Sequence, residues 1–320
     1  MDNYADFFVR DQLLVSLAKA QYIPRQLGAS GTFESIGLTG THIAIEEVAE
    51  NGVAESSAIP RGGVPHVVKL DKNSVKTFTT SSHAWTATVQ ADEVLNARAT
   101  GTSGAAEILM NRIDRATAKL RRQADFQHEY LRVACLNSPS NVFGSAPAAA
   151  VIAFGSNDSG IRAAIHNHIV LPMEAALGGL DYTGIDAWCS NAYWAAFIES
   201  KTVRETYLGY AKAAELLNRP ADDFEYGGVT WHRYRASGNI AIEAGTAKMV
   251  PRGVVGLFLQ CFAPDDTTDS VGRGALGEPY YINSMPLITP AGIKGYQLAL
   301  QTHPLMLCTR PAAILTVDLS

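Results

Sequence analysis

Hydrophobic and polar positions alternate near the end of the chain, where a two-residue period predicts strands. Residues 296–301 (YQLALQ) alternate in sidedness, and in residues 313–319 (AILTVDL) the side chains of Ile314, Thr316 and Asp318 share one face. Pro304 and Pro311 restrict the apolar segment between them. Because proline interrupts helices, this end of the chain is predicted to be sheet.

A helical period dominates residues 103–136. The positions expected on its inner face recur three or four residues apart, at Ile113, Ala116, Leu120, Ala124, Gln127 and Leu131. The other faces are expected to carry Arg115, Lys119, Arg122 and Asp125. The predicted helix would be about 50 Å long, with Ser103 as its N-cap and a stop at residues 137–139. Periodicity alone also fits a core helix of an α/β protein or a coiled-coil segment.

The first third of the chain contains strand patterns with unusually polar surroundings. Residues 41–48 alternate, with Ile43 and Ile45 on one side. Residues 66–70 and 74–80 flank a turn-forming cluster at residues 71–73, which predicts the tip of a hairpin. A ribbon this polar buries too little surface to be stable alone. It is therefore expected to lie on another part of the molecule or on a neighbour.

The beginning of the chain predicts a short amphipathic helix that stops near Pro24. Its apolar residues are Phe7, Phe8, Leu13, Leu14 and Leu17. Residues 27–40 are too rich in Gly and Ser to pack alone, so the segment is either an arm or a frayed terminus. Acidic residues surround the apolar ones and no basic flank is present, which argues against a signal peptide and favours a cytoplasm-like environment.

The middle of the chain mixes both periods. Residues 158–177 are predicted to be helical with a break at Pro172, and residues 193–217 to contain one or two helices. Residues 228–236 and 254–262 read as buried strands. This combination predicts a compact α+β unit.

Composition narrows the classes of function. At 320 residues and 47% apolar content the chain can build a sizeable core, and its length predicts two domains. The 26 basic and 31 acidic residues give a net charge of −5, which argues against nucleic-acid binding through phosphate neutralisation. The four cysteines are far apart and form no Cys-x-x-Cys pair, so buried, reduced thiols are expected.

Candidate chemical motifs are weak. Residues 272–277 (GRGALG) match a dinucleotide-binding pattern, but three aspartates precede them and Pro279 follows, so a loop is the better interpretation. His166 and His168 lie two apart and are expected on different sides of a helix. The carboxylate pairs, such as Asp265 and Asp266, are interpreted as solvated loop charges. Most tryptophan rings are assigned to core or subunit contacts. We therefore expect no catalytic residues, no cofactor and no metal.

The order of several segments resembles a known family. At the end of the chain come GEPYY (277–281), KGYQL (294–298), QTHPL (301–305) and an Arg-Pro pair before the last strand. Earlier come residues 41–48, residues 61–94, the long helix and residues 187–208 in the same relative order. Together they resemble the phage major capsid protein E family of the lambda type across almost the whole chain.

The resemblance implies an α+β, Hong Kong 97-type tailed-phage capsid fold. It implies an N-terminal arm (1–40), a peripheral-domain strand with the extended loop (41–100, hairpin about 50–82) and a spine helix (101–140). An axial domain (141–285) and C-terminal strands that return to the core (286–320) complete the expected organisation.

The implied function is self-assembly into pentamers and hexamers that form an icosahedral shell around double-stranded DNA, in a virion assembled in the host bacterial cytoplasm. The expected intersubunit contacts of the extended loop are Arg61, Gly62, Gly63, Lys69, Asp71, Lys72, Lys76 and Phe78. Those of the arm are Phe7, Phe8, Leu13 and Leu14. Implied partners are a separate scaffold protein, a portal protein and a decoration protein, with no membrane.

Two alternatives remain open at this stage. An encapsulin-like compartment would share the fold and enclose a cargo enzyme. A soluble α/β enzyme would need a convergent polar pocket, which the sequence does not display.

Overall fold

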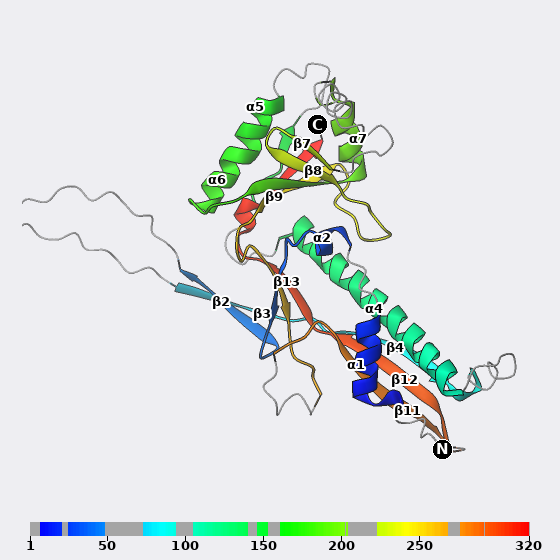
Figure 1. Ribbon diagram of the computed structural model, residues 1–320. Coiled ribbons are helices and arrows are strands. Elements are labelled where there is room, and N and C mark those ends of the chain that lie inside the picture. Colours follow the sequence, from blue (N-terminus) through cyan, green and yellow to red (C-terminus); the bar gives the residue numbers. More distant parts are fainter. Residues whose placement is uncertain are drawn as a thin grey trace, which may run out of the picture.

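A computed structural model of the chain describes residues 7–20, 25–48, 73–93, 105–139, 146–152, 161–201, 203, 223–267, 276–290 and 292–319. Figure 1 shows an upper unit, a lower unit built along one long helix, a small sheet between them and a ribbon that projects to one side. The fold is α+β, as the two hydrophobic periods predicted.

The upper unit is a six-stranded sheet with the order β5-β14-β9-β6-β8-β7. Its strands are β5 (Ala150–Ile152), β6 (Gly184–Cys189), β7 (Asp223–Tyr226), β8 (Val229–Arg233), β9 (Thr246–Arg252) and β14 (Leu315–Leu319). The central strand β6 is buried along nearly its whole length, which explains its continuous apolar run. Trp231 is fully buried and stacks on Phe197 with ring centroids 4.3 Å apart.

Helices pack on this sheet and complete its core. They are α5 (Ile161–Ile165), the π-helical turn η2 (His166–Val170), α6 (Leu171–Leu177) and α7 (Asn191–Glu199). The break expected at Pro172 takes the form of the π-helical turn η2, which ends two residues before this proline, a residue that cannot donate a backbone hydrogen bond. Ile165, Met173 and Phe197 enter the same hydrophobic cluster as the sheet residues.

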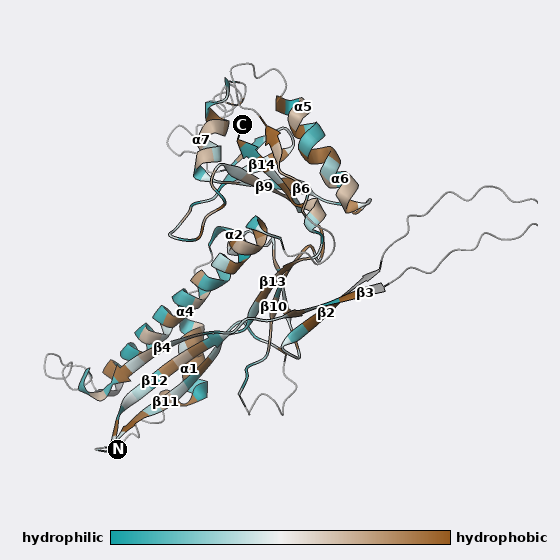
Figure 2. Ribbon diagram, turned by 180° about the vertical axis from the view of Figure 1, so that it is seen from behind, coloured by the Kyte–Doolittle hydropathy of each residue, from teal (hydrophilic) through white to brown (hydrophobic). Residues whose placement is uncertain are grey.

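The lower unit combines the sheet β11-β12-β4 with helix α4 (Ala105–Asn137) and helix α1 (Arg10–Lys19). Its strands are β4 (His83–Gln90), β11 (Tyr281–Thr289) and β12 (Gly292–Thr302). Leu109, Ile113 and Leu120 pack with Leu298 and Leu300 in one cluster. Figure 2 shows hydrophilic and hydrophobic residues interspersed along α4, as expected for an amphipathic helix.

The long helix is confirmed, with one correction to its faces. Leu120 and Ala124 are buried and Arg122 is exposed, as predicted. Asp125 was expected on an outer face, but it is only 7% exposed and accepts a hydrogen bond from the hydroxyl of Tyr280. The helix therefore buries a wider face than the apolar period indicated, because tertiary partners satisfy its polar groups.

The small middle sheet has the order β1-β10-β13 and connects the two units. Its strands are β1 (Glu34–Gly37), β10 (Phe258–Phe262) and β13 (Pro304–Cys308), and the short helix α2 (Gln26–Ala29) precedes it. Its hydrophobic cluster includes residues of α4 and of the upper unit, among them Leu136, Trp188 and Tyr234. All four cysteines are buried and free, as predicted.

The ribbon consists of β2 (His42–Val48) and β3 (Asn73–Thr79), which form a two-stranded sheet and pair with no other described strand. Their antiparallel register runs from His42 opposite Thr79 to Val48 opposite Asn73. Asn73 was expected in a turn, but it begins β3. The predicted partner strand at residues 66–70 lies outside the described residues.

The sheets divide the chain differently from the expected ranges. Strand β10, within the range predicted for the axial domain, lies in the middle sheet. Strand β14, within the predicted C-terminal range, lies in the six-stranded sheet between β5 and β9. A 3-10 turn, η3 (Pro311–Ala313), leads into β14 and returns the chain to the upper unit.

Candidate assembly surfaces

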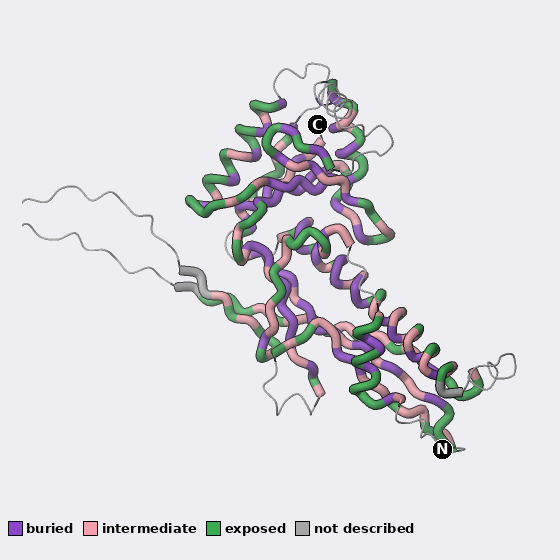
Figure 3. The backbone as a smooth tube through the Cα atoms, viewed as in Figure 1, coloured by how far each residue is buried: buried purple, intermediate pink, exposed green. Residues whose placement is uncertain are grey.

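The ribbon contributes no described residue to any of the three hydrophobic clusters. Ile43 lies opposite Phe78 in the register, and both side chains are only half-buried. Lys76, opposite Ile45, is exposed. In Figure 3 the described part of the ribbon carries exposed and intermediate residues only. Ile43 and Phe78 therefore form an apolar pair on a polar ribbon, and this pair could pack against the surface of another molecule.

Most of the predicted loop contacts cannot be placed. Arg61, Gly62, Gly63, Lys69, Asp71 and Lys72 lie outside the described residues. Lys76 and Phe78 lie on β3, so the structure brings these two together on one strand.

The N-terminal helix packs on its own chain. Leu13 is fully buried, and Phe8 stacks on Tyr296 with ring centroids 3.9 Å apart. Phe7 is half-buried against the same cluster. The guanidinium of Arg121 donates to the carbonyl oxygens of Leu17 (2.7 Å) and Ala20 (2.6 Å), which satisfies the end of α1. Phe8 and Leu13 thus hold the segment to the lower unit.

The outer side of α1 remains exposed. Leu14 is 38% exposed, and Val9 and Val15 are about half exposed. Further large apolar side chains are exposed on the β11–β12 hairpin, at Met285, Ile288 and Ile293. Exposed apolar groups gathered on projecting elements are typical of protein–protein contacts.

A buried polar cluster, missed by the sequence analysis, joins the units. We call Glu129, Arg132, Tyr234 and Gln260 the junction cluster. The Glu129 carboxylate accepts hydrogen bonds from the backbone N–H groups of Leu27 (2.9 Å) and Gly28 (3.0 Å). It also accepts from Tyr234 (3.0 Å) and Arg132 (3.2 Å), and Arg132 donates to Gln260 (2.8 Å).

The hydrogen bonds of the junction cluster have a structural role. Burial, together with the charge and hydrogen bond of Glu129, raises the pKa of Tyr234 well above its ordinary value. The Tyr234 hydroxyl therefore keeps its proton and donates it in the hydrogen bond to Glu129. Glu129 and Arg132 lie three residues apart on α4, a spacing at which opposite charges pair on one helix face, and this spacing is the signal that could have found them.

A second polar network lies on the upper sheet. His232 contacts Asp223 through Nδ1 (2.7 Å) and Asp186 through Nε2 (3.3 Å). Arg252 donates from Nε to Asp186 (2.9 Å), and Trp188 stacks on His232. Burial lowers the pKa of His232, but the hydrogen bonds and charges of the two aspartates outweigh it, and the net pKa is raised.

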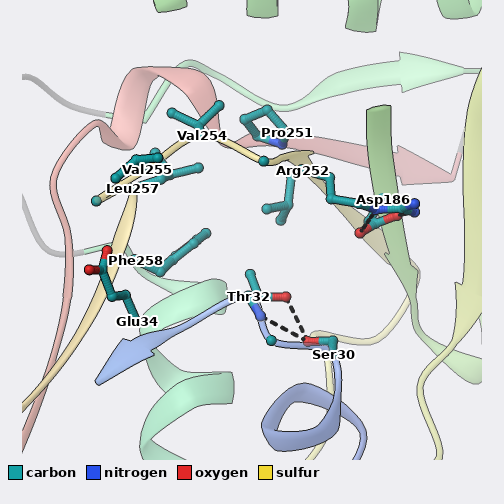
Figure 4. A pocket seen from close by; sticks show the side chains of 14 residues that line it. Ser30, Thr32, Glu34, Asp186, Pro251, Arg252, Val254, Val255, Leu257 and Phe258 are labelled. Carbon is teal, nitrogen blue, oxygen red and sulfur yellow. Dashed lines mark hydrogen bonds and ion pairs between the residues drawn. The ribbon is translucent and has the colours of Figure 1, made fainter. Parts of the chain in front are cut away.

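A cavity of about 370 Å³ lies where residues 30–34 pass the turn between β9 and β10. Figure 4 shows Ser30 and Thr32 on one side, and Val254, Val255 and Phe258 on the other. Among the described residues that line the cavity, Asp186 and Arg252 form an ion pair. Within the described residues, the cavity assembles no nucleophile beside a general base.

The weak motifs resolve into structural roles. His166 and His168 are both exposed on η2 and take part in no described group of potential metal ligands. Gly277 closes the glycine pattern, and its N–H donates to the carbonyl of Leu38 (2.8 Å). A Cβ atom at Gly277 would collide with the backbone of Phe262. Three of the four tryptophans, Trp188, Trp194 and Trp231, are buried in the core together with Tyr193, and Trp85 is half-buried.

Asp265 corrects one expectation. The pair Asp265 and Asp266 was interpreted as solvated loop charges, and Asp266 is exposed. Asp265 is only 4% exposed and accepts a hydrogen bond from Thr267 (3.0 Å).

Among the described helices, none is long and apolar enough to cross a membrane.

Comparison with known proteins identifies the fold. The capsid of cyanophage Pam1 aligns with a TM-score of 0.58 at 11% identity, covering 94% of this chain and 93% of that one. The mature capsid of bacteriophage PhiM1 aligns with a TM-score of 0.56 at 14% identity (94% and 88% covered). The putative capsid protein of a prophage of E. coli CFT073 aligns at 0.55 and 12% identity (97% and 99% covered). These similarities confirm the Hong Kong 97-type capsid fold.

Sequence comparison identifies the family. No curated protein matches the chain significantly. Residues 10–319 match the family model described as phage major capsid protein E. Because this match spans nearly the whole chain, the protein belongs to the phage major capsid protein E family and is a structural subunit of an icosahedral virion shell.

Proposed function

We propose that copies of this chain form the pentamers and hexamers of the shell, and that the ribbon β2–β3 makes the contacts between neighbouring subunits. The observation that carries the proposal is that no described ribbon residue enters a core cluster of its own chain. A two-stranded ribbon without a packed face is marginal in isolation. Symmetric assembly supplies the missing surface at every subunit.

The contact residues of this proposal are those of the extended loop. Phe78 offers an apolar side chain and Lys76 a charge on the same strand. Arg61, Gly62, Gly63, Lys69, Asp71 and Lys72 fall in the connection between β2 and β3 and are proposed to extend the same contact. On the arm, Leu14 is the proposed contact, since Phe8 and Leu13 are occupied by intrachain packing.

The two units take the roles that the family organisation implies. The upper unit, β5 to β9 with β14, is the proposed axial domain that surrounds the local symmetry axis of each capsomer. The lower unit with α4 as spine helix is the proposed peripheral domain. The separate sheets and hydrophobic clusters of the two units support this division.

The shell is proposed to enclose double-stranded DNA without reading its sequence. The net charge of −5 supports this, since sequence-independent tight binding to phosphates needs an excess of basic residues. Assembly in the host bacterial cytoplasm, with a scaffold protein, a portal protein and a decoration protein as partners, completes the proposal. We propose no enzymatic activity and no cofactor.

The family match favours a phage shell over an encapsulin-like compartment. A soluble α/β enzyme is disfavoured because, among the described residues, the 370 Å³ cavity beside residues 30–34 has no nucleophile next to a general base.

Removal of the ribbon tests the proposal. His42 and Thr79 are register partners, so residues 43–78 can be replaced by a two-residue Asn-Gly turn. We expect the deletion variant to keep near-native circular dichroism, because the cores are untouched. Sedimentation velocity and electron microscopy should show small oligomers in place of closed shells. Intact shells from a folded deletion variant would disprove the ribbon's role.

A further inference from the structure

Three potential metal ligands meet where the middle sheet joins the lower unit. One ligand atom each of Asp265, Asp266 and His303 lies within 4.8 Å of the other two. Asp265 and His303 are 4% and 5% exposed, whereas Asp266 is exposed. The group therefore has two buried members and one side open to solvent.

The backbone holds these residues in place. Strands β10 and β13 pair antiparallel with Phe262 opposite Pro304, and the N–H of Ala263 donates to the carbonyl of His303 (3.0 Å). Asp265 follows two residues later, and His303 is the single residue between β12 and β13. The imidazole and the first carboxylate are thus presented by paired strands, and rigid elements position ligands well.

His303 supplies an independent sign of a ligand. Its Nε2 atom is buried, and among the described residues it has no hydrogen-bond partner. Leaving a buried polar atom without a partner is unfavourable, so native structures rarely do so. A neutral imidazole nitrogen carries a lone pair that a metal ion accepts.

We propose that Asp265, Asp266 and His303 bind one divalent transition-metal ion, with water in the remaining positions. A nitrogen and two carboxylate oxygens form a ligand set that suits Zn²⁺ or Mn²⁺ better than Ca²⁺ or Mg²⁺. Ligands about 2.1 Å from one tetrahedral ion lie about 3.4 Å apart, so the three groups, now within 4.8 Å of one another, need to close by at most about 1.4 Å. The ion also neutralises two carboxylates, one of which is buried.

This site goes beyond shell formation, because it would fasten the segment after β10 to the β12–β13 junction within one subunit. The bound ion is then expected to raise the thermal stability of the folded chain, since it binds the folded state selectively.

The test uses the full chain, stripped with a chelator and dialysed against Zn²⁺ or Mn²⁺ alone. Elemental analysis should count one ion per subunit, and the melting temperature should rise with the ion. His303→Gln and Asp265→Asn should bind at least about tenfold more weakly and lose the rise. Matched controls are His168→Gln and Asp92→Asn, both at exposed positions, which should bind as the unaltered protein does.

Asp266→Asn keeps the test decisive if either buried variant fails to fold. Because Asp266 is exposed, its substitution should leave the core intact and still weaken binding. Unchanged affinity in folded Asp266→Asn and His303→Gln, or no bound ion in the unaltered chain, would overturn the site. Shell formation is scored separately by electron microscopy, so loss of the ion and loss of assembly are distinguishable.

Discussion

Glu129 and Tyr234, 105 residues apart in the sequence, are joined by a hydrogen bond of 3.0 Å between the tyrosine hydroxyl and the carboxylate. Glu129 lies on α4 in the lower unit, and Tyr234 follows β8 of the upper unit. The contact is buried, since Glu129 is fully inaccessible and Tyr234 is 2% exposed. The long helix is therefore tied to the upper unit by a polar bond as well as by apolar packing.

Replacing Glu129 should loosen this connection. Glu129→Ala removes the acceptor of two backbone N–H groups and of the Tyr234 hydroxyl, and it removes the carboxylate that pairs with Arg132. We expect a loss of about 3–5 kcal/mol in the free energy of unfolding, because the substitution leaves a buried charge uncompensated. Denaturant unfolding of the unassembled chain measures it. Glu107→Ala, at an exposed position of the same helix, should change stability little, and equal losses in the two variants would contradict the role of the cluster.

The faces of α4 give a second prediction. Leu120 is 4% exposed, whereas Arg122 is exposed. Leu120→Asp would bury an unpaired carboxylate at a cost of several kcal/mol, comparable to much of a domain's stability. We expect it to abolish folding, while Arg122→Ser remains folded. Circular dichroism and melting curves compare them, and similar behaviour of the two would show that the assigned faces are wrong.

Gly277 should tolerate no side chain. Its missing Cβ would meet the carbonyl group of Phe262, which is backbone and cannot rotate away. Gly277→Ala should therefore lower the melting temperature, since the backbone at residue 277 must shift away from Phe262 and Ala263 at the end of β10. At Gly40 a Cβ would meet nothing within 4 Å, so Gly40→Ala is the control. A Gly277→Ala variant as stable as the control would refute the close approach.

The network at His232 predicts a pH dependence of stability. Burial lowers the pKa of His232, but hydrogen bonds with Asp186 and Asp223 prevail and raise it above the unfolded value of 6.5. The folded state thus holds the proton more tightly than the unfolded chain. The stabilisation is fully present below the unfolded pKa and is lost as the pH rises through the folded pKa.

His232→Gln isolates this contribution. The melting temperature of the unaltered chain should exceed that of the variant by more at about pH 5.5 than at about pH 8.5. His128 has the opposite sign, because burial, aided by Arg132 and His83, lowers its pKa to about 3. Its stabilisation is present above about pH 6.5 and is lost toward acid. A difference in melting temperature between the unaltered chain and His232→Gln that does not vary with pH would contradict the raised pKa of His232.

Local periodicity was sufficient for the elements themselves. The alternation around Ile43 predicted β2, and the three- and four-residue spacing through Leu120 predicted α4. The break at Pro172 also follows from the sequence, because proline lacks a backbone donor wherever it stands. These features depend on residues within one or two turns of each other.

Partners distant in the chain were decided only by the tertiary structure. Asn73 lies in a strand because β3 pairs with β2 in a register that sets Asn73 opposite Val48, a residue 25 positions earlier in the chain. Asp125 and Glu129 are buried because Tyr280, Tyr234 and the backbone at Leu27 supply donors. Burial of a charge is favourable only when such donors converge, and no local pattern records that convergence. The long helix, several strands and the family thus follow from local patterns in the sequence, whereas α2, β1, the strand position of Asn73 and the facing of buried polar groups depend on contacts between distant segments.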